Sequence, residues 1–305
     1  MFKLSKYLRN PDYRFLINSK FGIYDGMDDA DFLRRKFKAR MGYELNLENP
    51  ATLNEKLNWL KLYDRNPLYT TLVDKALVKD YVAPIIGQQH IIPTLGVWDR
   101  FDEIPFDALP QRFVLKCTHD SGGLVVCRDK AALNLRSARK KIEGALKHNY
   151  YLVGREWPYK DVRPRILAEQ YMENTDAAGR PCGLIDYKFF CFNNEPRLLY
   201  ISQGLENHAT ASISFYDLEG RELPYRRSDY KPIGPVTLPD NFPQMRAMAG
   251  TLAEKVDSPF VRIDLYSIKG EVYFSEITFS PCSGLIPFEP AEWDAKLGEL
   301  LELPR

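Results

Sequence analysis

The sequence runs Val261-Arg262-Ile263-Asp264-Leu265 and then, after the turn Lys269-Gly270, Glu276-Ile277-Thr278. These apolar segments predict two antiparallel strands on which Asp264 and Glu276 can lie across from each other. Two like charges on a mainly buried surface repel each other unless a cation joins them. Magnesium shared with substrate phosphates would remove the conflict. The alternatives are that both carboxylates face solvent, or that Arg262 pairs with one of them.

A second segment, Phe113-Val114-Leu115-Lys116-Cys117, leads into a turn that contains Ser121-Gly122-Gly123. The apolar runs on both sides of this turn predict a hairpin. Glycine amides and the Lys116 ammonium can bind phosphates, although such a hairpin is more often only a turn. Both GxxxxGK[ST] and GxGxxG are absent, so a P-loop or a Rossmann site is not indicated. Together with the two acidic strands, the hairpin predicts a nucleoside-triphosphate site.

Composition limits the kind of protein that could carry this site. The chain has 305 residues, 45% of them hydrophobic, which is enough for one large domain or two to three subdomains. Its 42 Lys and Arg residues balance 41 Asp and Glu residues, so overall charge does not favour a nucleic-acid partner. The first forty residues hold ten Lys or Arg against five Asp. This excess fits a polyanion or a membrane surface, but a solvated helical face is the simpler interpretation.

The first residues of the chain lack the apolar core of a signal peptide, and no run approaches the ~20 apolar residues of a membrane span. A cytoplasmic location is therefore expected, with peripheral association at the inner membrane surface as an alternative. The five cysteines are scattered and odd in number, which predicts reduced core residues and not a zinc site or disulfide framework.

Hydrophobic periodicity predicts an α+β protein. Helices are expected over 28–41, 52–63, 71–82, 134–149 and 239–256, with a Thr-x-x-Glu capping box at Thr52. Strands are expected over 113–117, 124–128, 165–170, 187–192, 197–203, 213–217, 260–266 and 272–278, with a looser one over 91–98. The strands and helices do not alternate strictly, which favours α+β over α/β.

The motifs occur in the order seen in ATP-grasp enzymes, and the chain resembles that superfamily from about residue 70 to 290. The motifs are Asp74-Lys75, Lys116, Ser121-Gly122-Gly123, Ile166 to Met172, Arg262-Ile263-Asp264 and Glu276-Ile277-Thr278. Two segments, Asp186 to Phe192 and Glu276 to Gly284, resemble the TupA-like ATP-grasp family, named for teichuronopeptide biosynthesis. The resemblance implies an ATP-grasp fold, in which two α+β subdomains clasp ATP. It also implies a helical region over 1–68 and an ATP-grasp domain over 69–305, with a lid at about 108–170 and a metal-binding catalytic subdomain at about 171–290.

The resemblance also implies roles for individual residues, with ATP and Mg²⁺ as cofactors. Arg262 would be catalytic, with Lys116, and would stabilise an acyl-phosphate intermediate. The metal ligands would be Asp264, Glu276 and Thr278, where Thr278 replaces the more usual Asn. Ser283 and Gly284 would meet the substrate. ATP would be bound by Lys75, Lys116, Gly122, Gly123, Glu169, Gln170, Met172 and, less specifically, Lys188.

The implied activity is a carboxylate-amine ligase that forms an amide and releases ADP and phosphate. The TupA-like resemblance implies that an amino acid or another amine is joined to the uronic acid carboxylate of a capsule, O-antigen or related cell-surface polysaccharide or its precursor. One alternative is a glycosyltransferase using a sugar nucleotide, because Asp29-Ala30-Asp31 has the DxD form. Charge at a helix N-terminus explains that tripeptide more simply. Another alternative, an ATP-grasp module that binds without turnover, is disfavoured by intact Lys116, Asp264 and Glu276.

Overall fold

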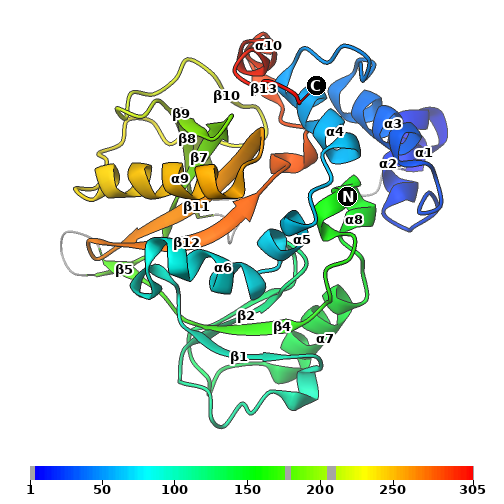
Figure 1. Ribbon diagram of the computed structural model, residues 1–305. Helices are drawn as coiled ribbons and strands as arrows, with labels where there is room; N and C mark the ends of the chain where they lie inside the picture. Colours follow the sequence, from blue (N-terminus) through cyan, green and yellow to red (C-terminus); the bar gives the residue numbers. More distant parts are fainter. Residues whose placement is uncertain (1–3, 176–179, 205–210, 305) are drawn as a thin grey trace.

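Two antiparallel sheets lie across from each other in the computed structural model, which describes residues 4–175, 180–204 and 211–304 (Figure 1). One sheet has the strand order β1-β4-β2-β3 and the other has the order β12-β11-β7-β8-β9. Together with the helices they confirm the α+β prediction. The strands of the first sheet are β1 (Thr94–Trp98), β2 (Phe113–Cys117), β3 (Leu124–Cys127) and β4 (Ile166–Gln170). The strands of the second are β7 (Ile185–Phe192), β8 (Glu195–Gln203), β9 (Ser212–Tyr216), β11 (Phe260–Ile268) and β12 (Glu271–Thr278).

Helices make up the N-terminal part of the chain, and those expected near residues 28–41 and 52–63 are both present. The capping box is also confirmed, because Thr52 Oγ1 accepts the Glu55 amide while a Glu55 carboxylate oxygen accepts the Thr52 amide. The helices are α1 (Leu4–Arg9), α2 (Pro11–Ser19), α3 (Asp29–Met41), α4 (Leu53–Tyr63), α5 (Leu68–Val73) and α6 (Leu77–Ile86). None of the described helices is long and apolar enough to cross a bilayer.

The single helix expected over 71–82 is wrong, because the chain breaks between α5 and α6. The Asp74 carboxylate accepts the amides of Ala76 and Leu77, at 2.8 and 3.1 Å, and so stabilises the turn that leads into α6. The Lys75 amide instead donates to the Thr118 carbonyl, 3.0 Å away. This break turns Lys75 toward the space between the sheets.

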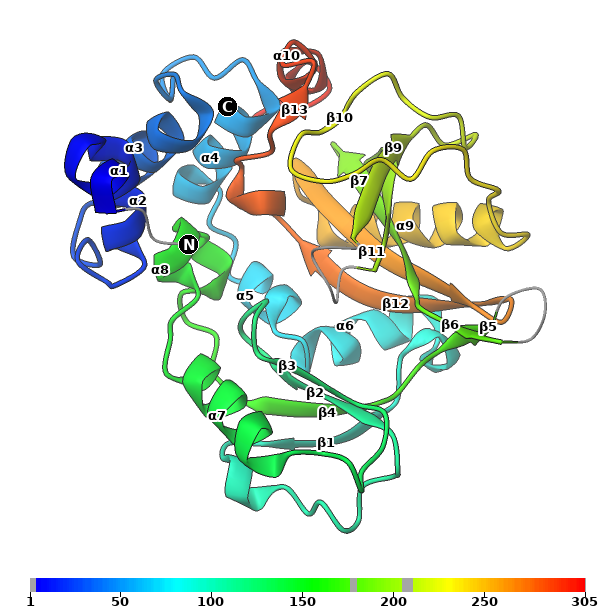
Figure 2. The same ribbon diagram turned by 180° about the vertical axis from the view of Figure 1, so that it is seen from behind.

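The remaining elements complete the two halves. On the four-stranded sheet, α7 (Leu135–Leu146) packs through Ala138 and Ile142 (Figure 2). On the five-stranded sheet, α9 (Phe242–Val256) covers one face (Figure 1). The short elements are α8 (Tyr151–Gly154), α10 (Trp293–Gly298), β5 (Asn174–Thr175), β6 (Pro181–Cys182), β10 (Arg226–Arg227) and β13 (Phe288–Glu289). The four-stranded sheet begins at Thr94, before the lid boundary expected near residue 108; the domain limits remain a proposal.

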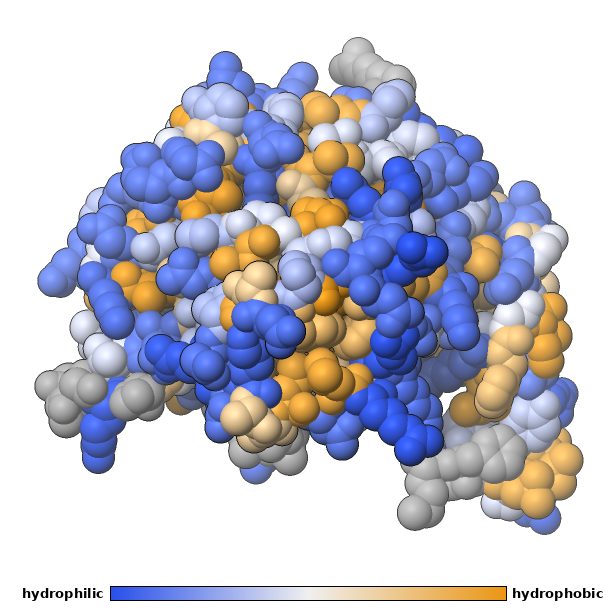
Figure 3. Space-filling view, turned by 90° about the horizontal axis from the view of Figure 1, so that it is seen from below, coloured by the Kyte–Doolittle hydropathy of each residue, from blue (hydrophilic) through white to orange (hydrophobic). Residues whose placement is uncertain are grey.

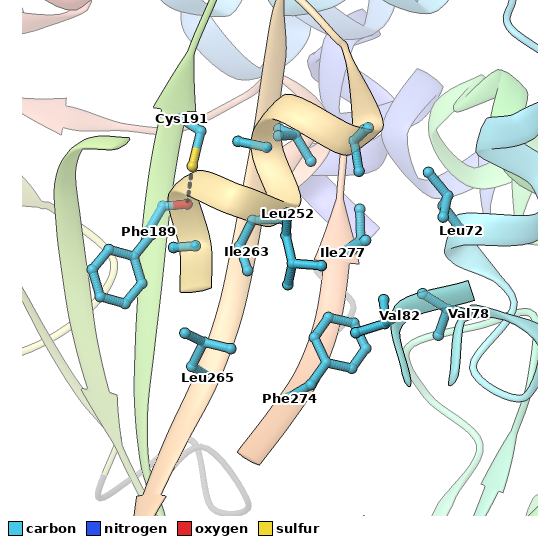
Figure 4. Packing of buried hydrophobic residues seen from close by; sticks show 14 of the residues in the cluster. Leu72, Val78, Val82, Phe189, Cys191, Leu252, Ile263, Leu265, Phe274 and Ile277 are labelled. Carbon is cyan, nitrogen blue, oxygen red and sulfur yellow. Dashed lines mark hydrogen bonds between the residues drawn. The ribbon is translucent and has the colours of Figure 1, made fainter. Parts of the chain in front are cut away.

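Strand alternation decides which side chains of β11 point away from the core. On β11, Val261, Ile263 and Leu265 join the main core beneath α9 and α6 (Figure 4). Successive residues of a strand point to opposite faces. Arg262 and Asp264 therefore lie on the other face, away from α9. The core packing of the odd-numbered residues thus fixes the direction of both charged side chains.

Candidate active site

A cavity of about 430 Å³ lies between the two sheets. The four-stranded sheet contributes Lys116 and Glu169, and the five-stranded sheet contributes Lys188 and Glu276. Its other lining residues from the predicted site are Lys75, Gly123, Gln170 and Met172. Residues as far apart in the sequence as Lys75 and Glu276 therefore meet at one cavity, where three lysines supply positive charge.

Glu169, on β4 of the four-stranded sheet, lies between two lysines. One of its oxygens lies 2.6 Å from Lys116 Nζ, and the other contacts Lys79 Nζ. Burial alone would raise the pKa of Glu169, but the two ammonium groups outweigh burial and hold the pKa below its ordinary value. This contact orients Lys116 toward the cavity. Glu169 therefore positions a lysine in addition to its predicted role in ATP binding.

Lys75 approaches the cavity from the break between α5 and α6. Its Nζ donates to the Asp120 carbonyl at 2.5 Å and lies 3.8 Å from Glu276 Oε1. The Glu276 side chain is 30% exposed, so it is open to the cavity. Lys75 therefore links the glycine turn to the five-stranded sheet.

Asp264 is fully buried and is surrounded by cations. Arg262 donates to it through Nε and Nη2, each at 2.7 Å, and Lys188 Nζ donates at 2.5 Å. Burial would raise the pKa of Asp264, but these two cations outweigh burial and lower it. These contacts show that Arg262 pairs with Asp264, which was one of the alternatives for the two carboxylates. Asp264 does not line the cavity itself.

Asp264 and Glu276 are nevertheless paired directly across β11 and β12, as predicted. The register shifts immediately after Asp264, at a bulge between Asp264 and Leu265. Arg262 also donates to Thr278 Oγ1 at 2.9 Å and to the Tyr200 hydroxyl at 3.2 Å. Its guanidinium is therefore held in place by three neighbouring residues.

The donor set suits a hard cation bound together with phosphates. Among the described residues, no group of three or more His, Cys, Asp or Glu side chains could hold a metal ion by itself. Mg²⁺ is usually bound by one or two carboxylates together with water and substrate phosphates, and Glu276 lines the cavity where such a cation would lie. Asp264 and the Thr278 hydroxyl have the oxygen atoms that Mg²⁺ prefers, but they would have to exchange their bonds to Arg262 and Lys188 to bind it. The neighbouring lysines at the cavity fit the phosphates.

The glycine turn has two glycines with different surroundings. A Cβ at Gly123 would lie 2.5 Å from Cys117 Sγ and 2.9 Å from Ala145 Cβ, so only glycine fits there. The Gly123 amide donates to the Asp120 carboxylate at 2.9 Å, so this side chain caps the turn. Gly122 has only the Asp120 carboxylate near its Cβ position, at 3.6 Å, and is the more open of the two.

The end of β4 and the residues that follow it, which include two residues predicted to bind ATP, form part of the cavity wall. Gln170 and Met172 both line it, beside Leu184 and Tyr171. The Gln170 amide already donates to the Pro93 carbonyl at 3.0 Å. Main-chain recognition at Gln170 therefore depends on its carbonyl or on rearrangement of this bond.

Ser283 and Gly284 are placed against the helices and not at the cavity. Their carbonyls accept from Lys61 Nζ at 2.9 Å and from Asn58 Nδ2 at 2.8 Å. Both residues have positive φ angles, 60° and 65°, as does Cys282 at 51°. For non-glycine residues this conformation is strained and persists only where the surroundings impose it. Direct contact with substrate remains a prediction for both residues.

Three residues in the site were missed by the sequence interpretation. Lys79 binds Glu169, Asp186 lies 3.2 Å from Lys188 Nζ, and Tyr200 binds Arg262. A signal for Asp186 was present, because it is two residues before Lys188 and so shares its face of the strand. Lys79 is four residues after Lys75, on the first turn of α6, but nothing local indicates its partner.

A family model described as TupA-like ATPgrasp matches residues 55–302. No curated protein shows a significant match to the chain. Similar solved structures include a D-alanine–D-alanine ligase from Bacillus anthracis complexed with ATP, at 13% identity and TM-score 0.38, covering 68% of this chain and 54% of that one.

Two further structures are similar at the same low level. The ATP-grasp ligase PsnB, solved with a precursor variant, Mg and ADP, has 10% identity and TM-score 0.41, covering 75% of this chain and 58% of that one. An ADP complex of purK, N5-carboxyaminoimidazole ribonucleotide synthetase, has 14% identity and TM-score 0.42. The match covers 74% of this chain and 50% of that one. The chain thus spans little more than half the length of these three proteins.

Proposed function

The chain belongs to the TupA-like ATP-grasp family, and we propose that it is an ATP-dependent carboxylate-amine ligase that acts through an acyl phosphate. The observation that carries this proposal is the pairing of Asp264 with Glu276 beside a cavity that Lys75, Lys116 and Lys188 line. Such a site matches the charge of a nucleoside triphosphate and its metal. The proposed cofactors are ATP and Mg²⁺, and the proposed location is the cytoplasm, where ATP is available.

In the first step of the proposed reaction, residues of the site would bind the phosphates and the metal ion. The substrate carboxylate attacks the γ-phosphorus of ATP, ADP leaves, and an acyl phosphate remains. Lys75, Lys116 and Lys188 would neutralise charge on the phosphates. Asp264, Glu276 and Thr278 would hold Mg²⁺, which when bound polarises the phosphoryl oxygens.

An amine then attacks the acyl carbon, loses a proton and displaces phosphate, which gives an amide. Arg262 would stabilise the oxyanion or the departing phosphate. To do so it would have to exchange its bonds to Tyr200 or Thr278, since its guanidinium is engaged in the structure. The glycine turn at Gly122 and Gly123 would cover the acyl phosphate against water.

The substrate class proposed is a uronic acid carboxylate of a cell-surface polysaccharide, or its precursor, joined to an amino acid or another amine. Support comes from the family alone, since no contact in the site identifies the acceptor. The glycosyltransferase alternative loses its motif, because Asp29 accepts the Tyr151 hydroxyl at 2.6 Å and lies in the first turn of α3. Asp29 is therefore a structural residue.

The test measures ADP and phosphate release with Mg-ATP across a panel of uronic acid glycans and amines. Release that requires both a carboxylate and an amine, together with mass-spectrometric detection of the amide, supports the ligase. No ATP binding by calorimetry and no release would refute it. ATP binding without release for any pair would favour a module that binds and does not turn over.

Lys116→Met is expected to weaken ATP binding by about tenfold to a hundredfold, because a charged hydrogen bond to a phosphate contributes roughly 1.5 to 3 kcal/mol. The fold should persist, since Glu169 would keep its contact with Lys79. The matched control is Lys79→Met, which removes the other lysine but does not line the cavity. Calorimetric titration with ATP compares the two variants. Equal loss of affinity in both would show that Lys116 acts only through Glu169.

A further inference from the structure

The most exposed large apolar side chains of the described residues lie together at the N-terminus. They are Phe21 at 78%, Leu8 at 65%, and Leu4 and Ile23 at 61% each. The next most exposed, Tyr63, is 56% exposed. Scattered apolar side chains on a surface need no explanation, but the concentration of the four highest values within twenty residues does.

These four side chains belong to one small structural unit. Leu4 and Leu8 are one turn apart on α1 and share a face, and Phe21 and Ile23 lie in the turn that follows α2. The two helices pack together through the Tyr7 hydroxyl, which lies 2.8 Å from Asn18 Oδ1 near the end of α2. Figure 3, in which α1 and α2 occupy the right-hand edge, shows apolar side chains along this edge.

The turn after α2 is held against the rest of the protein by buried contacts. The exposure of Phe21 and Ile23 is therefore not due to a loosely packed turn. The buried Arg155 guanidinium donates to the carbonyls of Tyr24 and Asp25 at 2.8 and 3.0 Å. Phe15 is fully buried beneath the same turn, with the ring centroid of Tyr24 4.7 Å from its own. The unit is thus held to α8 and the main body while Phe21 and Ile23 project away.

Exposed basic residues are interspersed with the apolar residues along the same segment. Lys6, Arg9, Arg14 and Lys20 are all exposed, against Asp12 and Asp25 in the same segment. An apolar face with a net positive rim is the composition of a segment that lies in the interface of an anionic bilayer. A protein partner or a second copy would not by itself require the positive rim.

We propose that Leu4, Leu8, Phe21 and Ile23, with the basic residues Lys6, Arg9 and Lys20, form a docking surface for anionic lipid membranes. The apolar side chains would enter the boundary between headgroups and acyl chains, and the basic side chains would contact phosphate headgroups. The surface lies outside residues 55–302, which the family model covers, so the inference does not rest on the proposed ligase activity.

Sedimentation of the full chain with vesicles tests this inference. Phosphatidylcholine vesicles that contain phosphatidylglycerol should bind the protein, pure phosphatidylcholine vesicles should bind it weakly, and added salt should reduce binding. Phe21→Ser with Ile23→Ser should lower binding more than about tenfold, since both substitutions remove apolar surface that would be buried among the acyl chains. Leu135→Ser, on α7 and 47% exposed, should leave binding unchanged.

Charge is tested by Arg9→Gln with Lys20→Gln, against the matched pair Lys140→Gln with Lys141→Gln on α7. Only the first pair should weaken binding to anionic vesicles, and all variants should keep the wild-type melting temperature. Absence of binding to either vesicle would overturn the proposal. Self-association that Phe21→Ser with Ile23→Ser abolishes, measured by sedimentation velocity without vesicles, would also overturn it in favour of a second copy.

Discussion

Replacing Glu276 by Gln is expected to lower kcat for ADP release by about a thousandfold, equivalent to roughly 4 kcal/mol of transition-state stabilisation. The amide keeps the size of the side chain but removes the charge of a proposed Mg²⁺ ligand. Stability should be almost unchanged, because the carboxylate is 30% exposed and its nearest cation, Lys75, is 3.8 Å away. Exposed pairs of this kind contribute about 0 to 1 kcal/mol.

The matched control for this variant is Glu271→Gln, which makes the same change at an exposed position of the same strand. Steady-state kinetics across a magnesium titration and denaturant unfolding would be measured for both variants. A kcat within about tenfold of wild type for Glu276→Gln would exclude Glu276 as an essential metal ligand. A large loss of stability would mean that it acts mainly through the fold.

The sequence allowed the facing carboxylates to be predicted because strand geometry is regular. Once β11 and β12 are joined by a short turn, the alternation of apolar residues on β11 decides the face of Asp264. The direction of Lys188 follows in the same way on β7. Glu276 reaches the same face as Asp264 only because the register shifts opposite Asp264 and Leu265, since Val272 and Phe274 of β12 lie in the core. Local alternation thus predicts the strand residues Asp264 and Lys188, whereas no local pattern in the sequence indicates the bulge beside Glu276.

What could not be predicted depends on contacts between distant segments. The bond between Lys79 and Glu169 joins a helix and a strand ninety residues apart, and no periodicity specifies it. The break at Asp74 was hidden because the apolar spacing continues across it. The placement of Ser283 against Lys61 depends on where α4 packs, which is a tertiary property.

Asp264→Asn is expected to destabilise the protein by about 3 to 5 kcal/mol, the usual cost of breaking a buried ion pair. Asp264 is fully buried, and its carboxylate balances both Arg262 and Lys188. Asparagine would leave those two cations together without a full counter-charge. Chemical denaturation at neutral pH measures the loss, with the mid-point compared at constant slope.

Asp264→Asn should also change how the free energy of unfolding depends on pH. Arg262 and Lys188 outweigh burial and lower the pKa of Asp264 in the fold. Its contribution is therefore present above the unfolded pKa of about 3.9 and is lost as the pH falls through the lower folded value. The variant lacks this titration, so its stability should fall less steeply at acid pH than that of the wild type.

A double variant separates the charge effect from any loss of packing. Asp264→Asn combined with Arg262→Met removes one of the two unbalanced cations, and it should be more stable than Asp264→Asn alone, because an uncompensated buried charge costs more than an apolar replacement. If the double variant is instead less stable by the full sum of the two single effects, Asp264 and Arg262 do not act as a pair. Turnover should be lost in Asp264→Asn, in Arg262→Met and in the double variant, since each site would lack its proposed metal ligand, its arginine or both.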